Sequence, residues 1–269
     1  MAVAQQLTKK AKACLAKKSE IPMSPLYHMG MAAQFKKESH LKYVQDALNF
    51  LACKAQVKLP FSEDDKEFLV EVYEAFWWGG LWVGYPEAAK LASHYVSMEG
   101  NTKSNPLMVD PTIYREAPIV IETMKAMKRY ILEQKKNNRN FQNIKCSDNA
   151  FDQKPYARKL WNMNENTQGR MVKDGVLRSP QNNTRLHRAD GHFYLNTITK
   201  ESGNSLSTTW RIDSYYDFEP FEKQQYYTNI SLGAINLIIY DGLSEYMVRL
   251  GVAKPFWYRM EWKEVWNNT

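Results

Sequence analysis

Three carboxylates and a tyrosine that could do chemistry lie within seven positions in the second half of the chain: Asp213, Tyr216, Asp217 and Glu219. The same segment carries four aromatic neighbours, Trp210, Tyr215, Phe218 and Phe221. Carboxylates set among aromatic rings can bind a cation or take part in acid–base chemistry. The ordinary alternative is a strand-to-loop junction with its aromatic residues in the core and its carboxylates in water. Residue types and spacing leave both interpretations open.

A β-hairpin is predicted to position these side chains. Residues 191–199 and 205–213 are rich in β-branched and aromatic residues, which favour strands. Lys200-Glu-Ser-Gly-Asn204 between them has the composition of a turn. The second strand therefore delivers the acidic, aromatic stretch at its end. We expect His192 to share a sheet face with this strand, although an ordinary strand histidine is the simpler interpretation.

Helices are predicted wherever apolar residues recur at three- and four-residue steps. This pattern covers four segments, residues 31–56, 63–76, 87–99 and 119–136. Ser62 precedes Glu-Asp-Asp65, which predicts an N-cap followed by an acidic first turn. A further helical segment is expected from about Ile230 to Arg249, split into two helices by Asp241-Gly242.

The predicted fold class is α+β. Residues 106–118 are expected to form a loop, and residues 254–262 a last strand. Helical periodicity fades beyond residue 137, where Asn, Gln, Lys and Asp dominate, so we place a boundary there. Residues 1–145 then form a helical N-terminal domain for delivery or partner binding. Residues 146–269 form an activity domain with a small antiparallel sheet and accessory helices.

Composition describes a folded, basic protein. The 269 residues are 44% hydrophobic and carry a formal net charge of +7, with the basic excess in the first half. Such a charge favours an anionic partner: nucleic acid, a membrane surface or a delivery machine. The lysines are dispersed without a recognition motif, so no specific nucleic acid is expected. The three cysteines, Cys14, Cys53 and Cys146, have no metal-ligand spacing and are interpreted as incidental thiols, with one disulfide left open.

The patterns of several catalytic classes are absent, including the phosphate loop, the nucleophile elbow and the zinc-protease helix. No apolar run reaches the roughly 18 residues of a spanning helix. No secretory leader is visible at the N-terminus. We therefore expect a cytoplasmic protein in the producing cell, exported by a route that needs no leader.

The layout from Gly191 to Trp262 resembles the activity domain of the colicin M family. Three stretches carry the resemblance: Asp213-Ser-Tyr-Tyr-Asp-Phe218, Val248-Arg-Leu-Gly251 and Phe256-Trp-Tyr-Arg-Met-Glu261. They span about a quarter of the chain. That family kills competing bacteria by cleaving lipid II, the lipid-linked peptidoglycan precursor, at its phosphate ester. It uses a divalent metal and acts in the periplasm of the target cell.

The resemblance implies roles for particular residues. Asp213, Tyr216 and Asp217 would be catalytic, with Asp213 and Asp217 holding Mg²⁺ and Tyr216 positioning the phosphate. Positive charge for substrate binding would come from Arg211, Lys223 and Arg249.

The family carries a His-Arg pair shortly after this motif. Here the corresponding stretch is Glu222-Lys-Gln-Gln-Tyr226, without a histidine. His192, or alternatively His187, is then the candidate to supply a catalytic histidine from the neighbouring strand.

The resulting hypothesis is a type VI-type antibacterial effector, whose partners would be a cognate immunity protein and a secretion-system component. Two alternatives stay open. The aromatic stretch 75–86 and the apolar segment 232–239 suit a non-enzymatic membrane-disrupting effector with peripheral membrane contact. The missing histidine suits a non-toxic secretion- or phage-associated interaction protein.

Overall fold

The computed structural model describes residues 13–14, 16, 38–82, 84–183, 189, 191–218, 227–232 and 235–267. The fold is α+β, as the sequence predicts. The chain divides into two compact units, each assembled from separate segments. Unit 1 comprises Met1–Gly100 and Tyr216–Pro255, and unit 2 comprises Asn101–Tyr215 and Phe256–Thr269. This division differs from the single boundary after residue 145 that the sequence pattern suggests.

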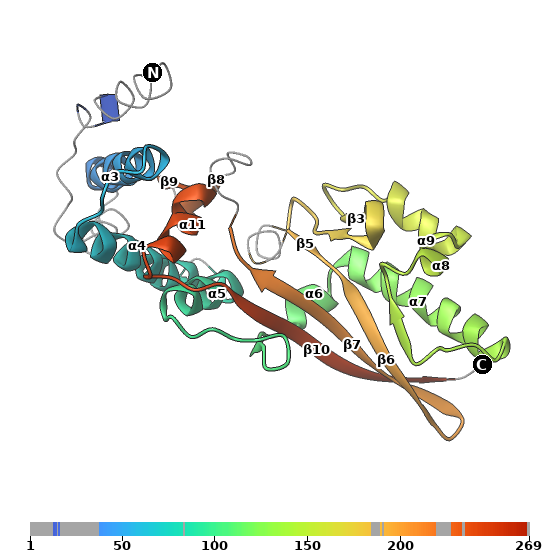
Figure 1. The fold of residues 1–269 in the computed structure, drawn as a ribbon. Coiled ribbons are helices and arrows are strands. Elements are labelled where there is room, and N and C mark those ends of the chain that lie inside the picture. The colour runs from blue at the N-terminus through green and yellow to red at the C-terminus, as the bar shows by residue number, and fades with distance from the viewer. Residues whose placement is uncertain are drawn as a thin grey trace, which may run out of the picture. The chain divides into compact units, whose positions relative to one another are not determined.

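Unit 1 is mainly helical (Figure 1). Its helices are α3 (Glu38–Gln56), α4 (Glu63–Trp82), α5 (Pro86–Val96) and α11 (Asp241–Arg249). Their apolar faces meet in a core that includes Val44, Leu48, Leu51, Leu69, Val72, Leu91 and Met247. Helices α3, α4 and α5 lie where the apolar periodicity predicts them, although residues 31–37 lie outside the described part of the chain.

The predicted N-cap of α4 is confirmed. The Asp65 backbone N–H donates to Ser62 Oγ at 3.2 Å, and the Ser62 N–H donates to Asp65 Oδ2 at 2.8 Å. This reciprocal pair satisfies two backbone donors at the helix start. Asp65 is 2% exposed and also forms an ion pair with Lys54 on α3, so the cap joins α3 and α4.

The helix predicted from about Ile230 is wrong in its first part. That part forms two strands, β8 (Tyr227–Leu232) and β9 (Ile235–Tyr240), which pair antiparallel from Tyr227↔Tyr240 to Leu232↔Ile235. A short apolar run cannot distinguish a strand from a helix by periodicity. The edge of β9 is held by Gln45, whose side chain accepts from the Ile238 N–H at 2.7 Å and donates to the Ile238 carbonyl at 3.1 Å. The expected break at Asp241 is correct, because α11 begins there.

Unit 2 is built on a five-stranded sheet of order β1-β10-β7-β6-β2. Its strands are β1 (Leu107–Met108), β2 (Asn143–Lys145), β6 (Leu195–Ser202), β7 (Ser205–Tyr216) and β10 (Phe256–Asn267). The β6–β7 hairpin and the last strand are confirmed, and Gly203 occupies the turn with φ +59°. The segment 106–118, expected to be a loop, contains β1 and a short helix, α6 (Thr112–Arg115).

One face of this sheet forms the core of unit 2. Leu206, Thr208, Trp210 and Ile212 are buried at alternate positions of β7. Helix α7 (Pro118–Lys136), predicted from its periodicity, lies against this face: Lys128 pairs with Glu264, and Trp210 Nε1 donates to the same carboxylate at 3.1 Å. Because strand side chains alternate, Arg211, Asp213 and Tyr215 lie on the opposite, open face.

Smaller elements complete unit 2. They are α8 (Asn149–Asp152), α9 (Pro155–Arg158), the 3₁₀ turns η1 (Lys159–Asn162) and η2 (Lys173–Gly175), and the three-stranded sheet of β3 (Arg170–Met171), β4 (Leu177–Arg178) and β5 (His192–Phe193). Cys146 joins them to the hairpin. Its buried thiol donates to the Gly175 carbonyl and accepts from the Leu195 N–H, both at 3.1 Å.

The other two cysteines form a disulfide, the possibility that the sequence left open. Cys14 and Cys53 are bonded across a separation of 39 residues. Within the described residues, no helix is long and apolar enough to cross a membrane. The side chains of residues 76–83, in the aromatic stretch, lie outside the description.

Candidate functional site

Two crossed ion pairs line the open face of the five-stranded sheet. Arg211 on β7 donates through Nε and Nη2 to Glu261 Oε2 on β10, at 3.0 and 2.8 Å. Two positions further along, Arg259 Nε on β10 donates to Asp213 Oδ1 on β7 at 2.6 Å. In the first pair the base lies on β7 and the acid on β10, and in the second pair the positions are reversed. Each of these four charged side chains is therefore neutralised by its partner across the strands.

The next pair of side chains across β7 and β10 is aromatic. The rings of Tyr215 and Trp257 lie with centroids 5.1 Å apart, and Lys103 Nζ lies 4.9 Å from the Trp257 centroid. Tyr215 is 44% exposed. A cation over an indole ring is held by the negative potential of the ring face while its other side stays in water.

On the other side of β7, strands β6 and β2 extend the open face. In the paired registers, Asn196 on β6 lies opposite Arg211, and Lys145 on β2 lies opposite Asn196. Three strands therefore place a lysine, an amide and an arginine in one row across the sheet.

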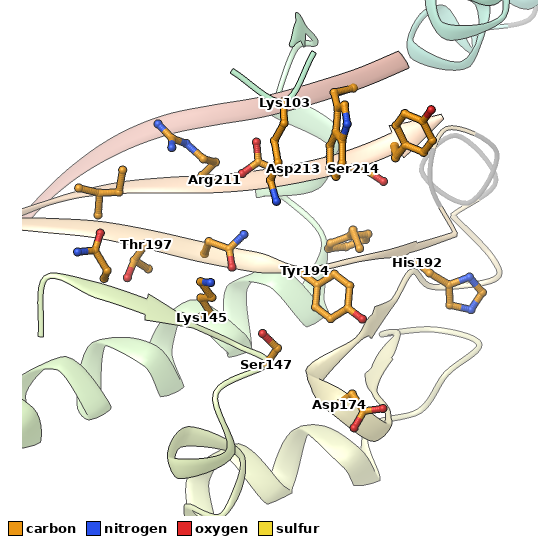
Figure 2. Close-up of a pocket in the computed structure, with 16 residues that line it drawn as sticks. Lys103, Lys145, Ser147, Asp174, His192, Tyr194, Thr197, Arg211, Asp213 and Ser214 are labelled. Atoms are coloured by element: carbon orange, nitrogen blue, oxygen red, sulfur yellow. The ribbon is translucent and has the colours of Figure 1, made fainter. Parts of the chain in front are cut away.

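Arg211, Asp213 and Tyr215 on β7 and Asn196 on β6 form the floor of a pocket of about 700 Å³, which we call the open-face pocket. Its walls include Lys103, Lys145, Asp174, His192, Tyr194 and Trp257. Figure 2 shows Lys103 reaching in from one side and Lys145 and Asp174 lying on the other. The volume is that of a site for a small molecule or for the head of a larger one.

Unit 2 carries the entire net positive charge of the protein. It contains 21 Lys+Arg against 13 Asp+Glu, whereas unit 1 contains 15 against 16. The sequence placed the basic excess in the first half of the chain, but chain folding collects it in the unit that holds the open-face pocket. Such a charge distribution raises the local concentration of anions.

The structure brings three of the predicted site residues together. His192, Arg211 and Asp213 all line the open-face pocket. Figure 2 shows His192 at one end of it, on the strand before Tyr194, and Arg211 and Asp213 along β7. Lys223, His187 and Glu219 lie outside the described residues.

Three other predicted residues belong to unit 1. Tyr216 packs edge-on against Tyr95 and Phe218, with ring centroids 5.5 and 5.3 Å apart. Burial, and next the charge of Asp241, raise the pKa of Tyr216 above its ordinary value of 10.0. The Tyr216 phenol therefore stays protonated at neutral pH, so it can donate a hydrogen bond but cannot act as a base.

The other two are surface groups of unit 1. Asp217 is exposed directly after the end of β7. Arg249 donates to Glu245 one turn earlier on α11, at 2.9 Å. Neither role that the resemblance implies for them is tested by this geometry.

The two predicted ligands of Mg²⁺ belong to different units, Asp213 to unit 2 and Asp217 to unit 1. Asp213 is also engaged by Arg259. Among the described residues, no group of three or more His, Cys, Asp or Glu side chains could hold a metal ion. The requirement for Mg²⁺ stays a prediction.

Sequence inspection missed Lys103, Lys145, Tyr194 and Trp257. They come from four separate segments, and pairing of β2 and β10 into the sheet brings them together. In the sequence, single lysines and aromatic strand residues of this kind occur throughout the chain, so no local signal marks these four as site residues. In comparisons with protein-family models, curated proteins and solved structures, no significant match was found.

Proposed function

We propose that this protein is an antibacterial effector that hydrolyses lipid II at its phosphate ester, with the open-face pocket as its active site. The observation that carries the proposal is the convergence of His192, Arg211 and Asp213 in one pocket of the basic unit. The resemblance of the hairpin and last strand to the colicin M family supports lipid II as the substrate.

The proposed reaction adds water across one bond. The water oxygen attacks phosphorus, the bond between phosphorus and the lipid oxygen breaks, and the lipid alcohol leaves with a proton. Such a reaction needs positive charge to offset the phosphate oxygens and a group that transfers the proton.

The pocket residues supply these parts in the proposal. Lys103 and Lys145 offset the phosphate charge, and Arg211 lies between β6 and β10 in the same pocket. His192 transfers the proton, and Asp213 orients the attacking water. The bond from Arg259 holds the Asp213 carboxylate in place, because both side chains are mostly buried, at 15% and 16% exposure.

The test incubates purified protein with lipid II in detergent, with Mg²⁺ or with EDTA, and follows the released pyrophosphorylated sugar-peptide by mass spectrometry. We expect release by the wild type and at least a hundredfold slower release by His192→Gln and Asp213→Asn, the range for loss of an acid–base group. Glu201→Gln, an exposed change at the far end of the same hairpin, is the matched control and should be as active as the wild type.

Tyr216→Phe, Asp217→Asn and Arg249→Gln test the roles that the resemblance implies for unit 1. Loss of release in these variants but not in the pocket variants would move the active site away from the open-face pocket. No release by the wild type in either buffer would overturn the proposed reaction.

Directed expression tests the compartment. Expression of the wild type in the bacterial periplasm should lyse cells, and expression of the wild type in the cytoplasm should not. Asp213→Asn should be harmless in both compartments. Equal harmlessness of the wild type in both compartments would favour a non-toxic interaction protein instead.

A further inference from the structure

We infer that the open-face pocket binds a phosphorylated sugar, with the phosphate between Lys103 and Lys145 and the sugar ring against Tyr194 and Tyr215. The inference names the part of the substrate that the pocket recognises, and rests on the proposed function only for the choice of an amino sugar. Of these four residues, the sequence had drawn attention only to Tyr215, as an aromatic neighbour of the acidic cluster.

We place the phosphate by asking which basic side chains near the pocket lack a carboxylate partner. On the open face of the sheet, Arg211 is paired with Glu261 and Arg259 with Asp213. Lys103 and Lys145, in contrast, form no ion pair within the described part of the chain. Figure 2 shows them entering the pocket from opposite sides. An anion between two uncompensated ammonium groups gains charge-assisted hydrogen bonds without breaking an ion pair.

The ring position follows from exposed aromatic surface. Tyr194 is 38% and Tyr215 44% exposed, and both line the pocket. Trp257, in contrast, is covered by Lys103 and Tyr215. Tyrosine offers a rigid, amphipathic contact surface at low cost in conformational entropy. The C–H groups on one face of a pyranose ring can pack against such a surface.

The ligand's hydroxyl groups also find partners. Asn143 and Asn196 line the pocket, and within the described residues neither side-chain amide has a hydrogen-bond partner. Asp174 supplies a carboxylate on the side of the pocket away from Lys103 (Figure 2). This carboxylate can accept hydrogen bonds from hydroxyl groups of the sugar.

Calorimetric titration with N-acetylglucosamine 1-phosphate tests the inference. We expect binding that weakens at least about tenfold for N-acetylglucosamine and for inorganic phosphate, each of which lacks one half of the ligand. Lys103→Ala and Lys145→Ala should each lower the affinity about tenfold, and Lys136→Ala, an exposed lysine at the end of α7, should not.

Tyr215→Ala separates the two halves of the site. It should weaken binding of the sugar phosphate but leave binding of inorganic phosphate unchanged. Far-UV circular dichroism of each variant checks that it folds, and Tyr215→Phe should restore binding, since only the ring surface is needed.

The outcomes distinguish this inference from the proposed function. No titration at millimolar ligand, or tighter binding of uridine 5′-monophosphate than of the sugar phosphate, overturns the inference even if lipid II is hydrolysed. Lysine-dependent binding of the sugar phosphate without hydrolysis of lipid II upholds the inference and overturns the proposed reaction.

Discussion

The Asp213–Arg259 ion pair allows a structural role of Asp213 to be separated from a catalytic one. Arg259 Nε lies 2.6 Å from Asp213 Oδ1, and both side chains are about 85% buried. Asp213→Asn leaves the guanidinium largely desolvated without its counter-charge. Removal of one partner of a fully buried pair costs 3–5 kcal/mol, so with partial solvent screening we expect a loss of about 2 kcal/mol in the free energy of unfolding.

The decisive variant exchanges the two residues, Asp213→Arg with Arg259→Asp. The exchange keeps an acid opposite a base, so its cost should be at least about 1 kcal/mol smaller than the sum of the single changes, Asp213→Asn and Arg259→Gln. It moves the carboxylate from β7 to β10, however, so hydrolysis of lipid II should stay at the level of Asp213→Asn.

Urea unfolding followed by circular dichroism measures stability, and the lipid II assay measures activity. The exchange of Lys135 and Glu201, a more exposed pair in the same unit, is the control and should change neither quantity appreciably. Recovery of hydrolysis in the Asp213–Arg259 exchange would show that Asp213 is structural. Single changes that cost under about 0.5 kcal/mol would refute the energetic reasoning.

Three further predictions concern stability and thiol chemistry. Asp65→Ala removes the acceptor of the Ser62 N–H at the start of α4 and the partner of Lys54, which is 13% exposed, so urea unfolding should show a loss of about 3 kcal/mol, whereas Asp64→Ala, at an exposed position, should cost little. Burial raises the pKa of the Cys146 thiol from 9.0 to about 12, so iodoacetamide should modify it at pH 8 only in urea. Because the native thiol keeps its proton where the unfolded thiol loses it, stability should fall from pH 9 to 12, and less steeply in Cys146→Ser. Reduction of the Cys14–Cys53 disulfide opens a 39-residue loop and should lower stability by about 4 kcal/mol, whereas an unchanged melting temperature would contradict this.

Local signals in the sequence sufficed for several elements. α7 and the cap of α4 depend on apolar spacing and on side-chain-to-backbone hydrogen bonds within one turn, which neighbouring residues specify. The β6–β7 hairpin was equally visible from its β-branched strands and glycine turn. β9 was mistaken for a helix because a six-residue apolar run fits both periods, and pairing with β8 and the Gln45 side chain settle it as a strand.

The cluster of acidic and aromatic residues marked Asp213 in the sequence, and the resemblance to the colicin M family added Arg211. Tertiary structure decided what surrounds them. β10 returns from the end of the chain to supply Glu261, Arg259 and Trp257, and pairings between distant strands leave no local trace in the residues that make them. The distribution of charge also depends on tertiary structure. The sequence determined the net charge of +7, but only the assembly of separate segments placed the whole positive excess in unit 2.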